Sequence, residues 1–399
     1  MIEKALAELT LNITDGKHGD CRGKDDSGYY FISCKDIREG QIHYEDARQI
    51  IEEDFWDTHK RTRLEPDDIL VTNSGTIGRM AFVRDVPLTY RTTFQKSVAI
   101  VKPDKAKIFP KYLYYQLQNC VDDFINRSNG AAQKNLLLST MRAFKMNIHE
   151  DEDLQMHIAA ILSAYDDLIE NNQKQIKLLE EAAQRLYKEW FVDLRFPGHE
   201  TTPIVDGIPQ GWERMVLSEV TSVLKRGISP KYSDNGKYSV INQKCIRSSI
   251  MDISESRRQE KEYVPTLNLQ DSDTVICSTG TGTLGRVGRV YGDYPNTTFD
   301  SHVTLVRAKE NPNYIYHVVK SQQEYLMGMG RGSTNQQELY RDVIERLVVL
   351  CPSQDILLKA DRVLNAIHCK IKAVYLQNNL LVESRDRLLP KLMSGEIEV

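Results

Sequence analysis

The chain has 399 residues, of which 41% are hydrophobic and 27% charged, and its formal net charge is −4 with a pI near 6.2. This composition is typical of a soluble globular protein of two or three domains, and no apolar run approaches the roughly 20 residues of a membrane-spanning helix. Seven scattered cysteines without a Cys-x-x-Cys pair argue against a disulfide framework or a zinc site, and the N-terminus lacks an apolar leader. These features predict a cytoplasmic protein whose nucleic-acid binding, if any, comes from local basic patches.

Residues 1–150 alternate short β-like runs with polar, glycine-containing turns, which is typical of a mixed α/β globule. One helix-like stretch, 111–126, interrupts the strands. The β-like runs are 29–33, 69–72, 80–83 and 98–101.

Residues 151–192 are predicted to form one long helix, because acidic residues at 151–153 favour a helix N-terminus. Residues 193–212 contain three prolines and three glycines and are expected to form a linker. Residues 213–352 then repeat the globule, and 353–399 repeat the helix and add a C-terminal tail.

The repeat is visible in short motifs about 200 residues apart. Gly75-Thr76-Ile77-Gly78-Arg79 returns as Gly282-Thr283-Leu284-Gly285-Arg286, and Thr92-Thr93-Phe94 returns as Thr297-Thr298-Phe299. A repeat of this length is not a solenoid, whose units have 20 to 50 residues. It predicts two similar, non-identical surfaces, which suit a ligand read in two halves.

Both long helices carry an apolar seam with a period of 3.5 residues, from 158 to 190 and from 360 to 392. Such a seam predicts a coiled coil, and the alternative is that each helix packs on its own globule. Residues 151–193 hold ten acids and four bases, whereas 354–395 hold four acids and seven bases, so opposite charge favours pairing of the two helices. An antiparallel register in which partner numbers sum to 550 would place Asn172 opposite Asn378, the two amides of the seams, as a register-fixing pair.

Motifs of catalysis are not evident. Gly280–Gly285 matches the dinucleotide fingerprint G-x-G-x-x-G, but the first copy, 73–78, lacks the first glycine, and Arg286-Val287 stands where a P-loop needs Lys-Ser or Lys-Thr. We therefore expect a tight turn between two strands. With no paired carboxylates, Gly-x-Ser-x-Gly elbow or His-x-x-x-His spacing, we predict no catalytic and no metal-binding residues.

Several turns combine small polar residues with Arg, Lys, Gln or Asn, which are the side chains that contact DNA bases and phosphates. The alternative is that they are solvated loops. In the first globule the predicted DNA-binding residues are Lys17, His18, Arg22, Ser74, Arg79, Thr92, Thr93, Gln95, Lys96, Gln133, Lys134 and Asn135. In the second they are Lys225, Arg226, Lys231, Thr281, Arg286, Asn296, Thr297, Arg331, Ser333, Thr334, Asn335 and Gln336.

With these residues in hand, the chain resembles the specificity subunit of type I restriction-modification systems over essentially its whole length. The resemblance is carried by the order of several motifs: Tyr30-Phe31-Ile32-Ser33, Asp67-Asp68-Ile69-Leu70, Gly130–Asn135, Leu186–Phe191, Gly207–Trp212 and the chain end from Leu388 to Glu396.

The resemblance implies an α/β (α+β) fold with a pseudo-two-fold internal repeat. It implies two target-recognition domains, 1–150 and 213–352, each reading half of a bipartite double-stranded DNA site, and two antiparallel spacer helices. It further implies docking to two DNA adenine methyltransferase subunits and, in the full complex, to restriction subunits. S-adenosylmethionine, ATP and magnesium are then expected on those partners and no cofactor on this chain. Two other hypotheses stay open: an enzyme that binds a nucleotide at Gly280–Gly285, and an adaptor that joins proteins without DNA.

Overall fold

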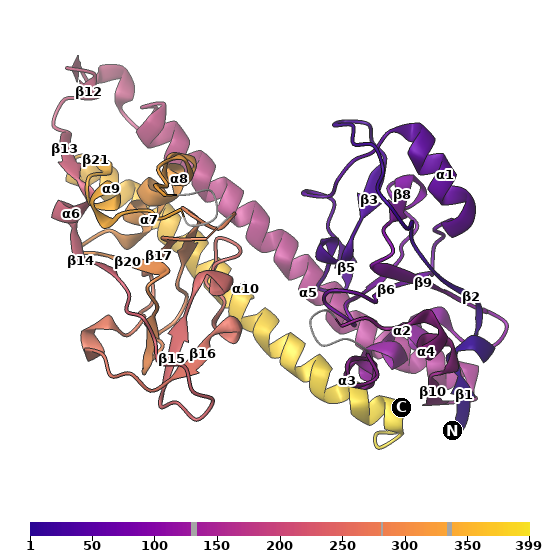
Figure 1. Ribbon diagram of the computed structural model, residues 1–399. Helices are drawn as coiled ribbons and strands as arrows, with labels where there is room; N and C mark the ends of the chain where they lie inside the picture. The colour runs from indigo at the N-terminus through magenta and orange to yellow at the C-terminus, as the bar shows by residue number, and fades with distance from the viewer. Residues whose placement is uncertain (129–133, 281, 333–336) are drawn as a thin grey trace. The chain divides into compact units, whose positions relative to one another are not determined.

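The computed structural model describes residues 1–128, 134–280, 282–332 and 337–399, and it divides into two compact units (Figure 1). Unit 1 comprises Met1–Glu170 and Asn379–Val399, and unit 2 comprises Asn171–Asn378. Each unit therefore contains one globule together with a segment of both long helices.

The globule of unit 1 is built on an antiparallel sheet with the strand order β2-β9-β6-β7. These strands are β2 (Thr10–Asp15), β9 (Val98–Pro103), β6 (Ile69–Thr72) and β7 (Met80–Phe82). All four residues of β6 are buried, because this strand lies inside the sheet with its two faces covered. The strands expected at 69–72, 80–83 and 98–101 are confirmed.

A second, parallel pair joins β3 (Tyr30–Ile32) to β8 (Thr92–Phe94). The helix-like stretch expected at 111–126 forms two helices, α2 (Pro110–Asn119) and α3 (Val121–Asn126). Helix α1 (Glu52–Thr62) was not expected from the sequence. The other elements of unit 1 are β1 (Ile2–Ala5), η1 (Leu6–Glu8), η2 (Cys34–Asp36), β4 (Ile37–Arg38), β5 (Gln41–Ile42), η3 (Thr89–Arg91), α4 (Leu138–Ala143) and β10 (Lys145–Ile148).

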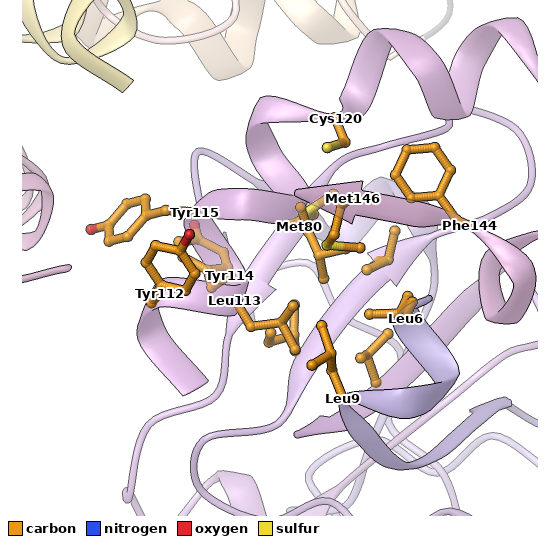
Figure 2. Packing of buried hydrophobic residues seen from close by; sticks show 14 of the residues in the cluster. Leu6, Leu9, Met80, Tyr112, Leu113, Tyr114, Tyr115, Cys120, Phe144 and Met146 are labelled. Atoms are coloured by element: carbon orange, nitrogen blue, oxygen red, sulfur yellow. The ribbon is translucent and has the colours of Figure 1, made fainter. Parts of the chain in front are cut away.

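The main core of unit 1 lies between the sheet, helix α2 and the first turns of the long helix. Figure 2 shows Leu6 and Leu9, from the η1 turn, facing the same apolar cluster as Met80 of β7 and Met146 of β10. Leu6 is fully buried, so the start of the chain is anchored to this core.

The globule of unit 2 repeats this plan with the strand order β14-β20-β17-β18. These strands are β14 (Thr221–Arg226), β20 (Val303–Ala308), β17 (Thr274–Cys277) and β18 (Val287–Arg289). The parallel pair is repeated by β15 (Tyr238–Ile241) and β19 (Thr297–Phe299), and β16 (Arg257–Gln259) adds an antiparallel strand to β15. The other elements of this globule are β13 (Glu213–Val216), α6 (Leu217–Val220), η6 (Gln243–Cys245), η7 (Ile253–Glu255), η8 (Pro265–Leu267), α7 (Pro312–Ser321), α8 (Gln323–Gly328), α9 (Arg341–Glu345) and β21 (Val348–Cys351).

Buried ion pairs stand at equivalent places in the two copies. In unit 1, Lys102 Nζ lies 2.7 Å from Asp68 Oδ2, and in unit 2, Arg307 Nη2 lies 2.7 Å from Asp273 Oδ2. Gly16 and Gly227 are also equivalent: a Cβ on either would overlap a backbone carbonyl oxygen, of Phe94 in one copy and of Phe299 in the other. The duplication inferred from short motifs therefore extends to tertiary contacts.

The two long helices are α5 (Glu152–Tyr187), continued by a π turn η4 (Lys188–Val192), and α10 (Gln354–Ser394). Asp151 begins α5, since its carboxylate accepts a hydrogen bond from the backbone N–H of Asp153 at 3.0 Å. In unit 2, Asn172 Nδ2 donates to Asn378 Oδ1 at 2.9 Å, and the two side chains are buried. The register in which partner numbers sum to 550 is confirmed at this pair.

The antiparallel pairing is present within each unit. In unit 1, Ile158 and Leu392 share one core cluster, and Arg385 Nη1 forms a 2.7 Å ion pair with Asp166 Oδ1. In unit 2, Ala183 and Leu364 share another core cluster. Both cores also contain residues of the globules, so each helix segment packs on its partner helix and on a globule at once.

The segment 193–212 is more ordered than the linker expected from its prolines and glycines. It contains η5 (His199–Thr201) and a short hairpin of β11 (Ile204–Val205) and β12 (Ile208–Pro209). Phe196 and Trp212 are buried, with ring centroids 4.8 Å apart, in the core of unit 2. Aromatic packing therefore fixes both ends of this segment to the second globule.

One equivalent contact differs in chemistry between the copies. In unit 1, the Tyr115 hydroxyl donates to Asp166 Oδ2 at 2.6 Å, whereas in unit 2 the equivalent residues are His317 and His368, whose Nε2 atoms lie 3.0 Å apart. The Tyr291 hydroxyl lies 2.8 Å from Nδ1 of His368. Both contacts are hydrogen bonds between neutral imidazoles if the Tyr291 hydroxyl donates to His368 Nδ1 and His368 Nε2–H donates to His317 Nε2. Burial, together with the nearby Arg289 cation, lowers the pKa of His317 to about 3 and that of His368 to about 2.

Candidate nucleic-acid interface

Four loops of unit 1, distant in sequence, meet beside the ends of β2, β6 and β8. Lys17 forms a parallel bridge with Gln95, and the backbone N–H of Lys96 donates to the Lys17 carbonyl at 3.1 Å. Ser74 forms an antiparallel bridge with Asn135. The backbone N–H of Asn73 donates to the Ser97 carbonyl at 3.1 Å and so joins these two pairs. The structure thus brings five of the predicted residues onto one surface.

Two cations beside this surface, Lys17 and Arg22, are paired with carboxylates of α1. Lys17 Nζ lies 3.2 Å from Asp57 Oδ2, and Arg22 Nη2 lies 2.7 Å from Asp54 Oδ1. The Arg22 side chain and backbone N–H lower the pKa of Asp54 to about 2, so this carboxylate is ionised near neutral pH. His18 is largely exposed, and its Nε2 lies 2.9 Å from Asp15 Oδ2. Among the other predicted residues of unit 1, Lys134 is exposed and Arg79 is half-buried.

Three threonines predicted to bind DNA are in the core instead. Thr92 and Thr93 are fully buried in β8, and Thr297 is 5% exposed in β19. The parallel pairing of these strands with β3 and β15 encloses them, and the Thr92 hydroxyl donates to the Leu88 carbonyl at 2.7 Å. The prediction was wrong for these residues, because side chains enclosed in the core cannot reach a duplex.

In unit 2, two of the three predicted arginines contact Glu338, Arg226 through its side chain and Arg331 through its backbone. Arg226 Nη2 lies 2.9 Å from Glu338 Oε1, and Arg331 exchanges backbone hydrogen bonds with Glu338 at 2.8 and 2.9 Å. Arg226 Nε also donates to the Ser301 carbonyl at 2.6 Å, which ties the end of β14 to the turn after β19. Lys225, Lys231 and Asn296 are exposed, while Arg286 is half-buried.

Six predicted residues lie outside the described residues: Gln133, Thr281, Ser333, Thr334, Asn335 and Gln336. The segment Gly280–Gly285, as far as it is described, lies between the paired strands β17 and β18. This position agrees with the tight turn expected from the sequence.

Sequence reasoning missed a group of exposed cations in unit 2. Arg257, Arg258 and Lys261 lie on or beside β16, opposite the segment that contains Lys231. A signal was present, since residues 257, 258 and 261 hold three bases within five positions. They were passed over because no turn motif marks them.

In the described parts of the chain, no group of three or more His, Cys, Asp or Glu side chains is placed to hold a metal ion. None of the described helices is both long and apolar enough to span a bilayer.

Comparison with known proteins places this geometry in a family. Two segments, residues 20–181 and 209–356, match the type I restriction modification DNA specificity domain. The chain is 28% identical to the type I restriction enzyme MjaIX specificity subunit of Methanocaldococcus jannaschii, over 83% of this chain and 78% of that protein. It is 22% identical to the HindI specificity subunit of Haemophilus influenzae, over 75% of this chain and 80% of that one.

A solved structure agrees with the fold. The S subunit of a type I restriction-modification system from M. genitalium has a TM-score of 0.56 and 15% identity, with 98% of this chain and 96% of that chain covered. The resemblance inferred from the sequence is therefore confirmed. Because the two matched segments together cover more than half of its length, the chain belongs to the family of type I restriction modification DNA specificity domains.

Proposed function

We propose that this chain is the DNA specificity subunit of a type I restriction-modification complex, in which each globule reads one half of a bipartite DNA site. The observation that carries the proposal is the pair of matched specificity domains, which share one strand order and carry polar loops at the ends of equivalent strands. Two similar but non-identical surfaces suit a site whose two halves differ in sequence.

The two helices act as the spacer between the half-site readers. At about 1.5 Å per residue, the 33 residues from 158 to 190 correspond to roughly 50 Å of helix, compared with about 34–36 Å for one turn of duplex DNA. The Asn172–Asn378 pair supports this role, because a buried polar pair disfavours a sliding register. A fixed register would give the site a fixed gap.

Catalysis belongs to other subunits in this proposal. The helices dock two DNA adenine methyltransferase subunits, and restriction subunits join the full complex. S-adenosylmethionine, ATP and magnesium bind to those partners, while this chain contributes recognition without catalysis.

Methylome sequencing tests the proposal. The chain is expressed with its methyltransferase in a host that lacks restriction-modification systems, and the host with the methyltransferase alone is the control. We expect methylated adenines in one bipartite motif with a constant gap, dependent on this chain. A continuous motif, or the same motif in the control, would contradict the proposal.

The two other hypotheses predict different results. An adaptor without DNA affinity would show no binding to duplex DNA even at low salt, where a DNA-binding protein binds most tightly. A nucleotide-binding enzyme would lose cofactor affinity in Gly282→Ala, whereas we expect methylation specificity to be independent of any nucleotide bound by this chain.

A further inference from the structure

The two globules contain an equivalent hairpin whose alignment is fixed by strand pairing. In unit 1, Tyr30 bridges Gln49 and Gly23 bridges Ile50, both antiparallel. In unit 2, Ser239 pairs with Arg258 and Tyr232 bridges Gln259. One constant shift of 209 residues relates all four positions to their counterparts. Residues 22–52 and 231–261 are therefore equivalent segments of equal length.

These equivalent segments differ in charge. Residues 22–52 hold five bases and seven acids, a net charge of −2, whereas residues 231–261 hold seven bases and four acids, a net charge of +3. The difference of five charges arises in a chain whose total is −4. A local excess of cations is the electrostatic footprint of nucleic-acid binding.

In unit 2, three exposed cations of the hairpin lie on or beside β16, and one of them stacks on an exposed tyrosine. The guanidinium of Arg257 lies 3.6 Å from the centre of the Tyr232 ring. Arg258 Nη1 donates to Ser239 Oγ at 3.2 Å, and Lys261 Nζ donates to the Ser229 carbonyl at 3.1 Å. Among the residues that the structure describes, no carboxylate is ion-paired with Arg257, Arg258 or Lys261. We call these three cations, with Tyr232, the basic hairpin patch.

In unit 1, two cations of the same hairpin are paired with carboxylates. Arg48, the counterpart of Arg257, forms a 2.5 Å ion pair with Asp20 and donates to the Cys21 carbonyl. Arg22 is paired with Asp54 and Glu53 of helix α1, and its counterpart Lys231 is also paired, with Glu260 at 2.9 Å, so the two hairpins differ at Arg48 and Arg257 and not at this position. Unit 2 has the single turn η8 where unit 1 has α1, so it lacks this source of acids.

We propose that the basic hairpin patch of unit 2 binds DNA backbone phosphates, and that the equivalent hairpin of unit 1 does not. The second globule then supplies more of the sequence-independent, salt-dependent affinity than the first. This inference rests on the proposed function, since it assigns part of DNA binding to one globule.

The geometry of the patch fits phosphates better than bases. A guanidinium stacked on a tyrosine ring keeps its N–H groups at the ring edge, where they can donate to phosphate oxygens. Arg258 and Lys261 are exposed on or beside the same strand as Arg257, so three cations lie within five residues of one surface segment. Each phosphate neutralised on binding releases counterions and steepens the dependence of affinity on salt.

The test measures this salt dependence for the full chain, alone and co-purified with its methyltransferase. The probe is a fluorescently labelled random-sequence duplex, and its affinity is measured by anisotropy between 50 and 200 mM KCl. The slope of log affinity against log salt should shrink by about 0.9 in Arg257→Gln, and by about 2 to 3 when Arg258→Gln and Lys261→Gln are added. The matched control, Arg48→Gln, changes the same residue type at the equivalent position and should leave the slope unchanged within error.

A second variant separates charge from structure. The charge-retaining triple variant Arg257→Lys, Arg258→Lys and Lys261→Arg should keep the wild-type slope, because phosphate contacts at this patch require charge. An equal loss of slope in Arg257→Gln and Arg48→Gln, or a loss in the charge-retaining variant, would overturn this inference alone. A wild-type chain that fails to bind the duplex at low salt in either form would overturn the proposed function as well.

Discussion

The amide pair at the seam of the two helices yields a quantitative prediction. Asn172 is 5% exposed and Asn378 is 8% exposed, and Asn172 also donates to Gln377 Oε1 at 3.4 Å. Replacing one member by leucine, which is similar in size, leaves the other amide buried without its 2.9 Å hydrogen bond. Each single variant should therefore lose about 1–3 kcal/mol of unfolding free energy.

The double variant Asn172→Leu/Asn378→Leu should be much less unstable than the sum of the singles. Two leucines make an apolar contact in the seam, where Ile371 and Val374 are already buried. Replacing both members of a buried polar pair is close to neutral or stabilising. We therefore expect a coupling free energy of about 2 kcal/mol or more between the two sites.

The assay is native-state hydrogen exchange under increasing urea, read at helix amides next to the pair. Local opening energies are used because a chain of two compact units need not unfold in one step. Additive effects, with the double variant equal to the sum of the singles within about 0.5 kcal/mol, would refute the reasoning that the two amides depend on each other.

Acidification from pH 7 toward 4 should reduce hydrogen-exchange protection more in unit 2 than in unit 1, because burial depresses the pKa values of His317 and His368 to about 3 and about 2. Below the ordinary histidine pKa of 6.5, each histidine takes up a proton in the unfolded state but stays neutral in the folded state. The free energy of unfolding therefore falls by about 1.4 kcal/mol per pH unit for each histidine. An equal loss of protection in both units would contradict this account. Gly16→Ala and Gly227→Ala should each destabilise their own unit by about 1–3 kcal/mol, because the new methyl group overlaps a backbone carbonyl oxygen. The control Gly328→Ala, which has open space around the methyl group, should leave thermal unfolding nearly unchanged. Equal effects of all three variants would argue against this steric overlap. Inserting one heptad into both helices should lengthen the gap of the methylated motif by about three base pairs, because seven residues add about 10.5 Å and one base pair spans about 3.4 Å. An unchanged gap would contradict the spacer role.

The errors of sequence analysis have identifiable physical causes. Helix α1 carries Glu52, Glu53 and Asp54 in its first turn and His59, Lys60 and Arg61 in its last, which is the charge order that a helix dipole favours. Its apolar residues are too few for a clear helical period, so the pattern alone does not predict a helix there. The buried threonines were misplaced for a different reason, because a polar Thr-Thr pair looks like a loop unless its parallel neighbour strand is known.

The sequence alone determined the duplication, the strand runs near 69–72 and 98–101, the two long helices and the facing amides at 172 and 378. These features are encoded locally, in periods of 3.5 residues and in short repeated motifs, so each can be read without knowing what lies beside it. Tertiary structure alone decided which cations are available to DNA. Arg48 and Arg257 occupy equivalent positions, but one lies beside Asp20 and the other beside Tyr232, because strand pairing brings each arginine next to residues distant in sequence. Charge availability depends on such neighbours, and they are distant in sequence.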